Sequence, residues 1–134
     1  MRLLLDTNIF LEILLEQKKH HEARSLLEHS YKHDFFLSDF SLHSIGLLLF
    51  REKKYQVFSK FIDDILGSGV ATMLALHAGN IDLVSKAAKR YQMDFDDAYQ
   101  YALAEQFNLN IVSFDKDFDK GERGRRTPAQ IINL

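Results

Sequence analysis

The sequence has 134 residues, of which 46% are hydrophobic, so it is long enough for one domain whose core needs no disulfide support. It contains no cysteine, which excludes disulfides, thiolate chemistry and cysteine-ligated zinc. The 17 basic and 19 acidic residues give a formal net charge of −2, a balance that neither favours nor excludes a nucleic-acid partner.

The chain begins with an apolar run that ends in an acid. Leu3–Leu5 predict a short strand buried on both faces, as in a parallel sheet. Asp6 follows at once, and Thr7 and Asn8 can open a helix. Because ligands of open α/β sheets bind at the carboxyl ends of the strands, Asp6 is a candidate site residue. The leucine run is too short for a signal peptide or a membrane span, so we expect a cytoplasmic protein without membrane contact.

Strand and helix patterns alternate along the rest of the chain. Helical spacing of apolar residues predicts helices over residues 9–16, 20–31, 40–50, 57–66, 80–92 and 95–107. Apolar runs predict strands over residues 35–37, 70–76 and 111–114, and a short edge strand at residues 131–132. The alternation predicts an α/β fold over residues 1–134 as one domain, with three α/β/α layers and a central parallel sheet of four to five short strands. Most of the phenylalanines fall on apolar phases and are expected in the core.

Two further acidic segments are predicted at the same edge of the sheet as Asp6. Asp115 directly follows an apolar strand, as Asp6 does. In the segment that opens the helix at residue 95, Asp94 is a good N-cap and Asp96 complements the helix dipole, which explains both without a site. Asp97 is freer to reach the strand ends. We therefore expect Asp6, Asp97 and Asp115 to converge.

Converging carboxylates need a counter-ion. Two of them about 4 Å apart repel by roughly 4 kcal/mol at an effective dielectric constant of about 20. Mg²⁺ or Mn²⁺ removes this penalty, prefers oxygen ligands and promotes phosphodiester hydrolysis. Residues 94–120 carry a net charge of −5 and residues 122–126 carry +2, which suits a metal site that handles a polyanion.

Four motifs occur in order along nearly the whole chain: Leu3–Phe10, Phe95–Ala98 at the start of a helix, Val112–Phe118, and the closing Thr127–Pro128. In combination they resemble a PIN domain. The resemblance implies a ribonuclease that depends on Mg²⁺ or Mn²⁺, an endonuclease most like the VapC-type toxins of toxin–antitoxin pairs. It also implies an antitoxin protein as partner and a homodimer as assembly.

The resemblance also implies roles for individual residues. Asp6, Asp97 and Asp115 correspond to the catalytic, metal-binding acids, and Asp117 is a further metal ligand. Polar side chains expected to support the pocket by hydrogen bonds are Asn8, Ser38, Ser44 and Ser113. Basic residues expected to hold the RNA backbone are Lys116, Lys120, Arg123, Arg125 and Arg126.

One position departs from the family pattern. The family usually has a glutamate early in the helix after Ser38, and alignment on Ser38 places Ser44 there. His43 points about 100° away on a helix, Asp39 precedes the helix proper, and Glu52 is two turns too far along. Either a neighbour substitutes, the site holds metal more weakly with three acids, or the chain is a fold relative with reduced or lost activity.

Two other functions stay open. The missing glutamate favours a non-catalytic module that binds RNA or an antitoxin-like partner. A phosphatase or phosphoacceptor domain with an aspartate-rich Mg²⁺ pocket fits less well. A haloacid-dehalogenase-like phosphatase needs a second aspartate where this chain has Asn8, and a receiver domain needs a lysine at the late strand end where it has Asp115.

Overall fold

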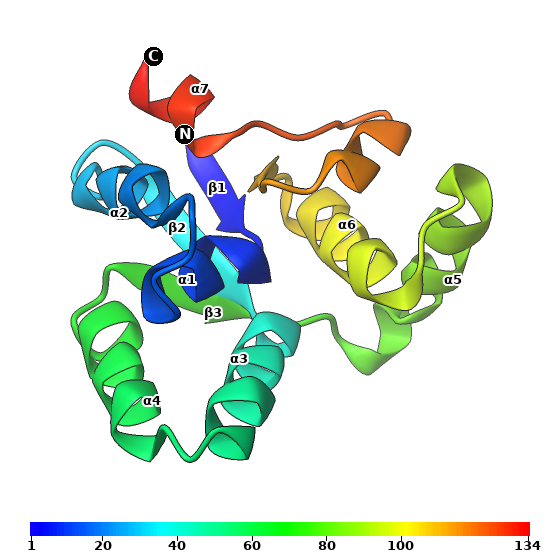
Figure 1. Ribbon diagram of the computed structural model, residues 1–134. Helices are drawn as coiled ribbons and strands as arrows, with labels where there is room; N and C mark the ends of the chain where they lie inside the picture. The colour runs from blue at the N-terminus through cyan, green and yellow to red at the C-terminus, as the bar shows by residue number, and fades with distance from the viewer.

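The structure, a computed structural model, describes residues 1–134 and contains a four-stranded parallel sheet (Figure 1). The strands lie in the order β3-β2-β1-β4, and neighbouring strands all run parallel. Their bounds are β1 (Arg2–Leu5), β2 (Asp34–Ser38), β3 (Ala71–Leu74) and β4 (Asn110–Val112). The predicted parallel sheet is confirmed, with four strands.

Strand β1 lies between two partners and is covered on both faces. Leu4 is in register with Phe36 of β2 and with Ile111 of β4. Leu3, Leu4 and Leu5 are all 0% exposed. Because side chains alternate along a strand, Leu3 and Leu5 belong to one hydrophobic core and Leu4 to the other. The N-terminal leucine run is thus buried as the sequence predicts.

Helices cover both faces of the sheet and give the predicted three layers (Figure 1). On the face of Leu3 and Leu5 lie α1 (Thr7–Leu14), α2 (His20–Glu28), α3 (Asp39–Arg51), α4 (Tyr55–Phe61) and α7 (Pro128–Ile132). On the face of Leu4 lie α5 (Asp82–Tyr91) and α6 (Phe95–Phe107). A π-helix, η1 (Ile62–Gly67), continues α4, and the 3₁₀ segments are η2 (Ala78–Asn80) and η3 (Lys116–Lys120). None of these helices combines the length and the apolar character that crossing a membrane requires.

The C-terminal segment differs from the prediction. The edge strand predicted at residues 131–132 is wrong, because these residues belong to α7. Thr127 and Gln130 form a reciprocal capping box: the Thr127 amide donates to Oε1 of Gln130 (2.8 Å), and the Gln130 amide donates to Oγ1 of Thr127 (3.3 Å). Pro128 occupies the first helical position, where an N–H has no partner within the helix. These local start signals outweigh the strand preference of two isoleucines.

The carboxyl ends of the parallel strands meet at one edge of the sheet, and two helices and a 3₁₀ segment begin there. Asp6, directly after β1, is the N-cap of α1, and Ser38, the last residue of β2, is the N-cap of α3. Asp115, which follows β4, is the N-cap of η3. Each of these side chains is thus fixed by a strand end on one side and a helix start on the other.

Candidate metal centre

Three aspartates gather at the carboxyl edge of the sheet. One carboxylate oxygen from each of Asp97, Asp115 and Asp117 lies within 4.8 Å of the other two. Asp97 comes from the first turn of α6, and the other two come from the loop and 3₁₀ segment after β4. We call these residues the acid cluster. Oxygen donors at this spacing form a set that suits a hard divalent cation such as Mg²⁺ or Mn²⁺.

Crowding of negative charge is strongest at Asp97. Burial of this half-buried carboxyl, together with the neighbouring charges of Asp115, Asp94, Asp6 and Asp117, raises its pKa from 3.8 to about 7. The Asp97 amide donates to Oδ1 of Asp94 (3.1 Å), so Asp94 is the N-cap that the sequence predicts. At neutral pH the Asp97 carboxylate is therefore poorly stabilised unless a cation shares the pocket.

Asp6 lies deeper than the acid cluster and is only 9% exposed. Its Oδ1 accepts hydrogen bonds from the Thr7 amide (2.9 Å) and from Nε2 of Gln100 (3.1 Å), and its Oδ2 accepts from Oγ of Ser113 (2.7 Å). Burial raises the pKa of Asp6, and these hydrogen bonds oppose the shift. Asp6 is not within the 4.8 Å group, although its charge acts on Asp97 and the charge of Asp115 acts on it.

Ser113 connects Asp6 to Asn8 and to the backbone of Asp115. Its hydroxyl donates to Asp6 and accepts from Nδ2 of Asn8 (3.1 Å) and from the Asp115 amide (2.9 Å). Oδ1 of Asn8 in turn accepts from the Phe114 amide (3.4 Å). The structure therefore brings Asn8 and Ser113 together beside Asp6 and Asp115.

A second set of contacts was not predicted from the sequence. Gln100 is 1% exposed, and its Nε2 donates both to Asp6 and to Oγ of Ser41 (2.8 Å). Oγ of Ser41 also lies 2.8 Å from Oγ1 of Thr7 and accepts from Oγ of Ser38 (3.2 Å). Ser38 thus reaches Asp6 only through other side chains. A glutamine within the otherwise apolar helical run of residues 98–104 is the signal that could have identified Gln100.

No acid replaces the missing glutamate on α3. Ser44 is half-buried one helical turn after Ser41, and its side chain has no hydrogen-bond partner. Oδ1 of Asp39 accepts a 2.7 Å hydrogen bond from the Tyr99 hydroxyl. Glu52 lies beyond the end of α3. Neither acid belongs to the acid cluster, so the cluster contains side chains from α6 and the β4 end only.

The basic residues divide into two groups, and the first lies near the acid cluster. Lys116 is exposed at the start of η3. Nζ of Lys120 is 3.7 Å from Oδ1 of Asp117, and Nη1 of Arg125 donates to the carbonyl oxygen of Ser113 (3.2 Å). Nε of Arg125 also lies 3.5 Å from Oδ2 of Asp119.

The second group consists of Arg123 and Arg126. Of these, Arg123 lies toward the amino-terminal edge of the sheet. Nη2 of Arg123 donates to Oδ1 of Asn108 and to the carbonyl oxygen of Leu109, both at 3.0 Å, at the C-terminal end of α6. Arg123 and Arg126 line a cavity together with Asn110, the first residue of β4, and Arg125 of the first group also contributes to this lining. Because α6 has 13 residues, its two ends are roughly 20 Å apart. The structure does not bring Arg123 to the acid cluster. The backbone of Arg126 pairs with β4, and its carbonyl oxygen accepts from the Ser113 amide (3.0 Å).

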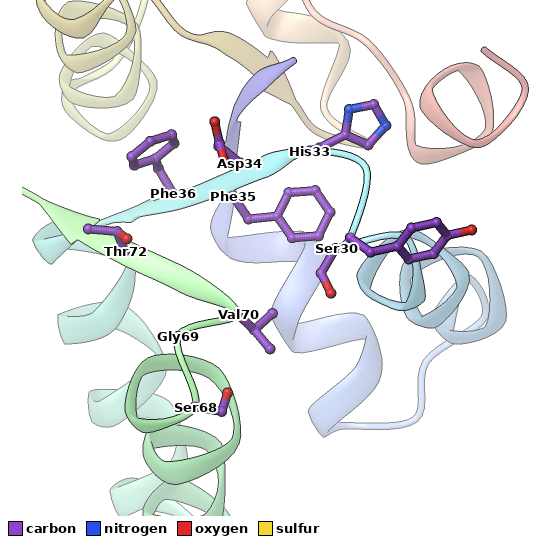
Figure 2. Close-up of a pocket in the computed structure, with 10 residues that line it drawn as sticks. Ser30, His33, Asp34, Phe35, Phe36, Ser68, Gly69, Val70 and Thr72 are labelled. Atoms are coloured by element: carbon purple, nitrogen blue, oxygen red, sulfur yellow. The ribbon is translucent and has the colours of Figure 1, made fainter.

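A separate cavity of about 350 Å³ opens at the amino-terminal edge of the sheet (Figure 2). Its walls are the residues before and within β2 and β3, including His33, Asp34 and Val70. Asp34 supplies the only carboxylate in this lining. The cavity therefore lacks a set of acids that could share a divalent cation, and it is distinct from the acid cluster.

Comparison with protein families gives one result that covers most of the chain. The family model described as PIN domain matches residues 3–123. Comparison with curated proteins finds no match.

Solved structures of bacterial proteins share this fold at low sequence identity. VapBC2 from Rickettsia felis, bound to a DNA fragment from its promoter, has a TM-score of 0.74 at 18% identity, and the match covers 95% of this chain and 97% of that one. FitAcB from Neisseria gonorrhoeae has a TM-score of 0.75 at 16% identity, covering 95% and 98%. VapC20 from Mycobacterium tuberculosis, described as a sarcin-ricin loop cleaving toxin, has a TM-score of 0.72 at 18% identity, covering 87% and 92%. At these identities the likeness shows a shared fold.

Proposed function

This chain belongs to the PIN domain family, and from that premise we propose that it is a metal-dependent ribonuclease that hydrolyses RNA phosphodiester bonds as an endonuclease. The single observation that carries the proposal is the acid cluster. Carboxylates of Asp97, Asp115 and Asp117 approach within 4.8 Å, and the one basic side chain that forms an ion pair with any of them is Lys120, whose Nζ lies 3.7 Å from Oδ1 of Asp117. A resident divalent cation accounts for this arrangement.

The residues present fit Mg²⁺ or Mn²⁺. All three donors of the acid cluster are carboxylate oxygens, and the raised pKa of Asp97, about 7, reflects burial and negative neighbours that a cation would neutralise. In this proposal Asp97, Asp115 and Asp117 hold the ion. Asp6 is the deeper acid, oriented by Ser113, and supplies negative charge from below.

The proposed chemistry needs little from the protein beyond position and charge. A bound Mg²⁺ or Mn²⁺ supplies an activated water and stabilises the charge that develops on a phosphoryl oxygen. Asp6, Asp97 and Asp115 are the proposed catalytic acids, and the products would be a 5′-phosphate and a 3′-hydroxyl. Asn8 and Ser113 keep the acids oriented through their hydrogen bonds, as groups behind metal ligands do.

The RNA backbone is proposed to meet the first group of basic residues. Lys116, Lys120 and Arg125 lie in or beside η3, next to Asp117. Cations at this position offset the repulsion between the acids and a polyanion. A contact of Arg126 with RNA stays a prediction, and a contact of Arg123 stays one that would require a substrate reaching the C-terminal end of α6.

The assembly is proposed by analogy with the solved relatives. VapBC2 is described as bound to a DNA fragment from its promoter, and VapC20 as a toxin that cleaves the sarcin-ricin loop. We propose that residues 1–134 act as a single nuclease domain in the cytoplasm, as a homodimer whose activity an antitoxin controls.

A second candidate function rests on Ser44. Because no acid on α3 completes the cluster, a catalytically weakened or inactive module that binds RNA or a protein partner is the alternative. Such a module has no need of the cation. Calorimetric titration with Mn²⁺ therefore separates the two functions: the nuclease binds Mn²⁺ at one site, and the binding module does not.

The test of the nuclease is cleavage of RNA by Asp6→Asn. We expect this variant to lose Mn²⁺-dependent cleavage and to keep the circular dichroism spectrum of the wild type. Asp34→Asn is the matched control, because Asp34 is an exposed aspartate at the opposite edge of the sheet. Cleavage by Asp6→Asn at the wild-type rate would remove the proposal.

A further inference from the structure

Gln100 is a buried polar residue in a stretch of α6 whose other members are apolar or aromatic. Its side chain is 1% exposed, and the residues around it from 98 to 104 are all buried. Glutamine is mostly found at protein surfaces, and a buried one is expected to have hydrogen-bond partners. The partners of its amide group therefore indicate what Gln100 does.

The position of Gln100 on α6 directs its side chain toward the candidate metal centre. Gln100 is three residues after Asp97, and residues three apart lie about 60° apart around a helix, on one face. Its Nε2 donates to Oδ1 of Asp6 (3.1 Å), directly after β1, and to Oγ of Ser41 (2.8 Å), in the first turn of α3. One amide group thus joins three elements that meet at the carboxyl edge of the sheet.

The two oxygens of Asp6 differ in the number of hydrogen bonds that they accept. Oδ1 accepts from the Thr7 amide (2.9 Å) and from Gln100, whereas Oδ2 accepts only from Oγ of Ser113 (2.7 Å). An ionised carboxylate has two acceptor positions on each oxygen. Oδ1 is therefore fully occupied, and the one acceptor position that is left on Asp6 belongs to Oδ2.

Of the two donors to Oδ1, Gln100 is the one that depends on the tertiary structure. The Thr7 amide belongs to the residue next to Asp6 and stays in place whatever side chain α6 presents. Gln100 is 94 positions away in the sequence and reaches Asp6 because α6 packs beside β1 and α3. Removal of its amide group would open the second acceptor position of Oδ1 and let the carboxylate turn.

Stability alone does not explain a glutamine at this position. Oε1 of Gln100 is buried and has no hydrogen-bond partner among the protein groups around it. A buried polar atom without a partner lowers the stability of the fold, and an apolar side chain of the same length would avoid that cost. Local features that cost stability are expected at functional sites.

We propose that Gln100 is a positioning residue of the candidate metal centre. By filling the last acceptor position of Oδ1, it leaves Asp6 with one free acceptor position, on Oδ2, with which to interact with the cation that the acid cluster holds. Ser113 fixes Oδ2 from the end of β4, and Gln100 fixes Oδ1 from α6. This inference rests on the proposed metal-dependent function and adds to it a neutral residue that acts through Asp6.

The test compares Gln100→Met with the wild type, because methionine matches glutamine in length and cannot donate a hydrogen bond. In calorimetric titration the variant should bind Mn²⁺ about 10- to 100-fold more weakly. In urea unfolding with EDTA it should unfold at no lower a urea concentration than the wild type, because the unpaired Oε1 is gone. With saturating Mn²⁺ the variant should lower kcat for RNA cleavage and leave KM unchanged, since Gln100 is too deeply buried to contact RNA.

Two control variants of α6 separate positioning from packing. Gln106→Met makes the same substitution at an exposed position of the helix and should change neither Mn²⁺ affinity nor the urea midpoint. Leu103→Val removes volume from the buried face of α6 one turn after Gln100. It should lower the urea midpoint and leave Mn²⁺ affinity unchanged, because it touches no hydrogen bond of Asp6.

The outcomes distinguish the positioning role from the nuclease. Equal losses of Mn²⁺ affinity for Gln100→Met and Leu103→Val, or an unchanged affinity for Gln100→Met, would overturn the positioning role, while RNA cleavage by the wild type would still support the nuclease. Weaker Mn²⁺ binding by Gln100→Met alone, with no RNA cleavage by the wild type, would support the positioning role and refute the nuclease. A wild type that binds no Mn²⁺ would overturn both.

Discussion

The hydroxyl of Ser113 donates a 2.7 Å hydrogen bond to Oδ2 of Asp6, although the two residues are 107 positions apart in the sequence. They are brought together because β1 and β4 are neighbours in the sheet, with Leu5 in register with Val112. Ser113 is 0% exposed, so water cannot replace it as the partner of Asp6. The orientation of the deepest acid in the site therefore depends on a strand pairing.

We expect Ser113→Ala to weaken both folding and metal binding. The substitution removes the donor to Asp6 and the acceptor for the Asp115 amide, leaving buried groups unpaired at a cost of about 1–3 kcal/mol. The affinity for Mn²⁺ should fall by about 10- to 100-fold. Urea unfolding and calorimetry measure the two effects. Ser59→Ala, at an exposed serine of α4 without side-chain hydrogen bonds, is the control and should change neither.

Asp97 makes the stability of the metal-free protein depend on pH. Its pKa is about 7 in the folded protein, because of burial and then negative neighbours, against 3.8 ordinarily. The folded state therefore binds the proton more tightly than the unfolded state, and stability should fall as the pH rises from about 4 to about 7. Asp97→Asn should be more stable than the wild type at pH 8 by about 1–2 kcal/mol, a value reduced for solvent screening of this half-exposed group.

The measurement is urea unfolding in EDTA across this pH range. The curves of Asp97→Asn and wild type should converge near pH 4 and separate above pH 7, and saturating Mn²⁺ should abolish the advantage of the variant. Asp96→Asn, at an exposed neighbour in the same helical turn, should follow the wild type. If the free energies of unfolding of Asp97→Asn and of the wild type depend on pH in the same way, the pKa of Asp97 is not raised in the folded protein.

The N-terminal cap of α7 is expected to contribute measurably to stability. Thr127→Ala removes the side-chain acceptor for the Gln130 amide and should lower the free energy of unfolding by about 1 kcal/mol. Thr127→Ser keeps the oxygen and should restore most of it. Thermal unfolding compares the two variants, and equal melting temperatures for Ala and Ser would contradict the role of the capping box.

The sequence predicts those features that local patterns encode, and it misses those that arise from packing. Leu3–Leu5 and the start of α6 at Phe95 are correct because an apolar run and an N-cap suffice to define them. The strand predicted at the end of the chain is wrong because a two-residue apolar run is too short to show a period, whereas Thr127, Pro128 and Gln130 are the residue types that start a helix.

The candidate site shows the same contrast between features that local patterns encode and contacts that arise from packing. Asp6 and Asp115 are visible in the sequence because each follows an apolar strand. The contact of Gln100 with Asp6 was not visible, because its polar side chain meets Asp6 only when α6 packs beside β1 and α3. Similarly, charge patterning places Arg123 beside the acids along the chain, but the length of α6 separates them in space. Sequence proximity is a poor guide where a helix intervenes.

Ser44→Glu should strengthen the candidate metal centre. Ser44 lies one turn after Ser41 on α3, and residues three apart share a helix face, so a longer acidic side chain at residue 44 would extend toward the pocket where the hydroxyl of Ser41 meets Gln100. An added carboxylate raises the charge and number of oxygen ligands, and we expect Mn²⁺ to bind about tenfold more tightly, with faster RNA cleavage. His43→Glu adds the same charge at the adjacent, exposed position, which points about 100° away. If both variants change Mn²⁺ affinity equally, the gain comes from net charge alone and Ser44 does not face the ion; a gain confined to Ser44→Glu would show that the missing glutamate limits this site.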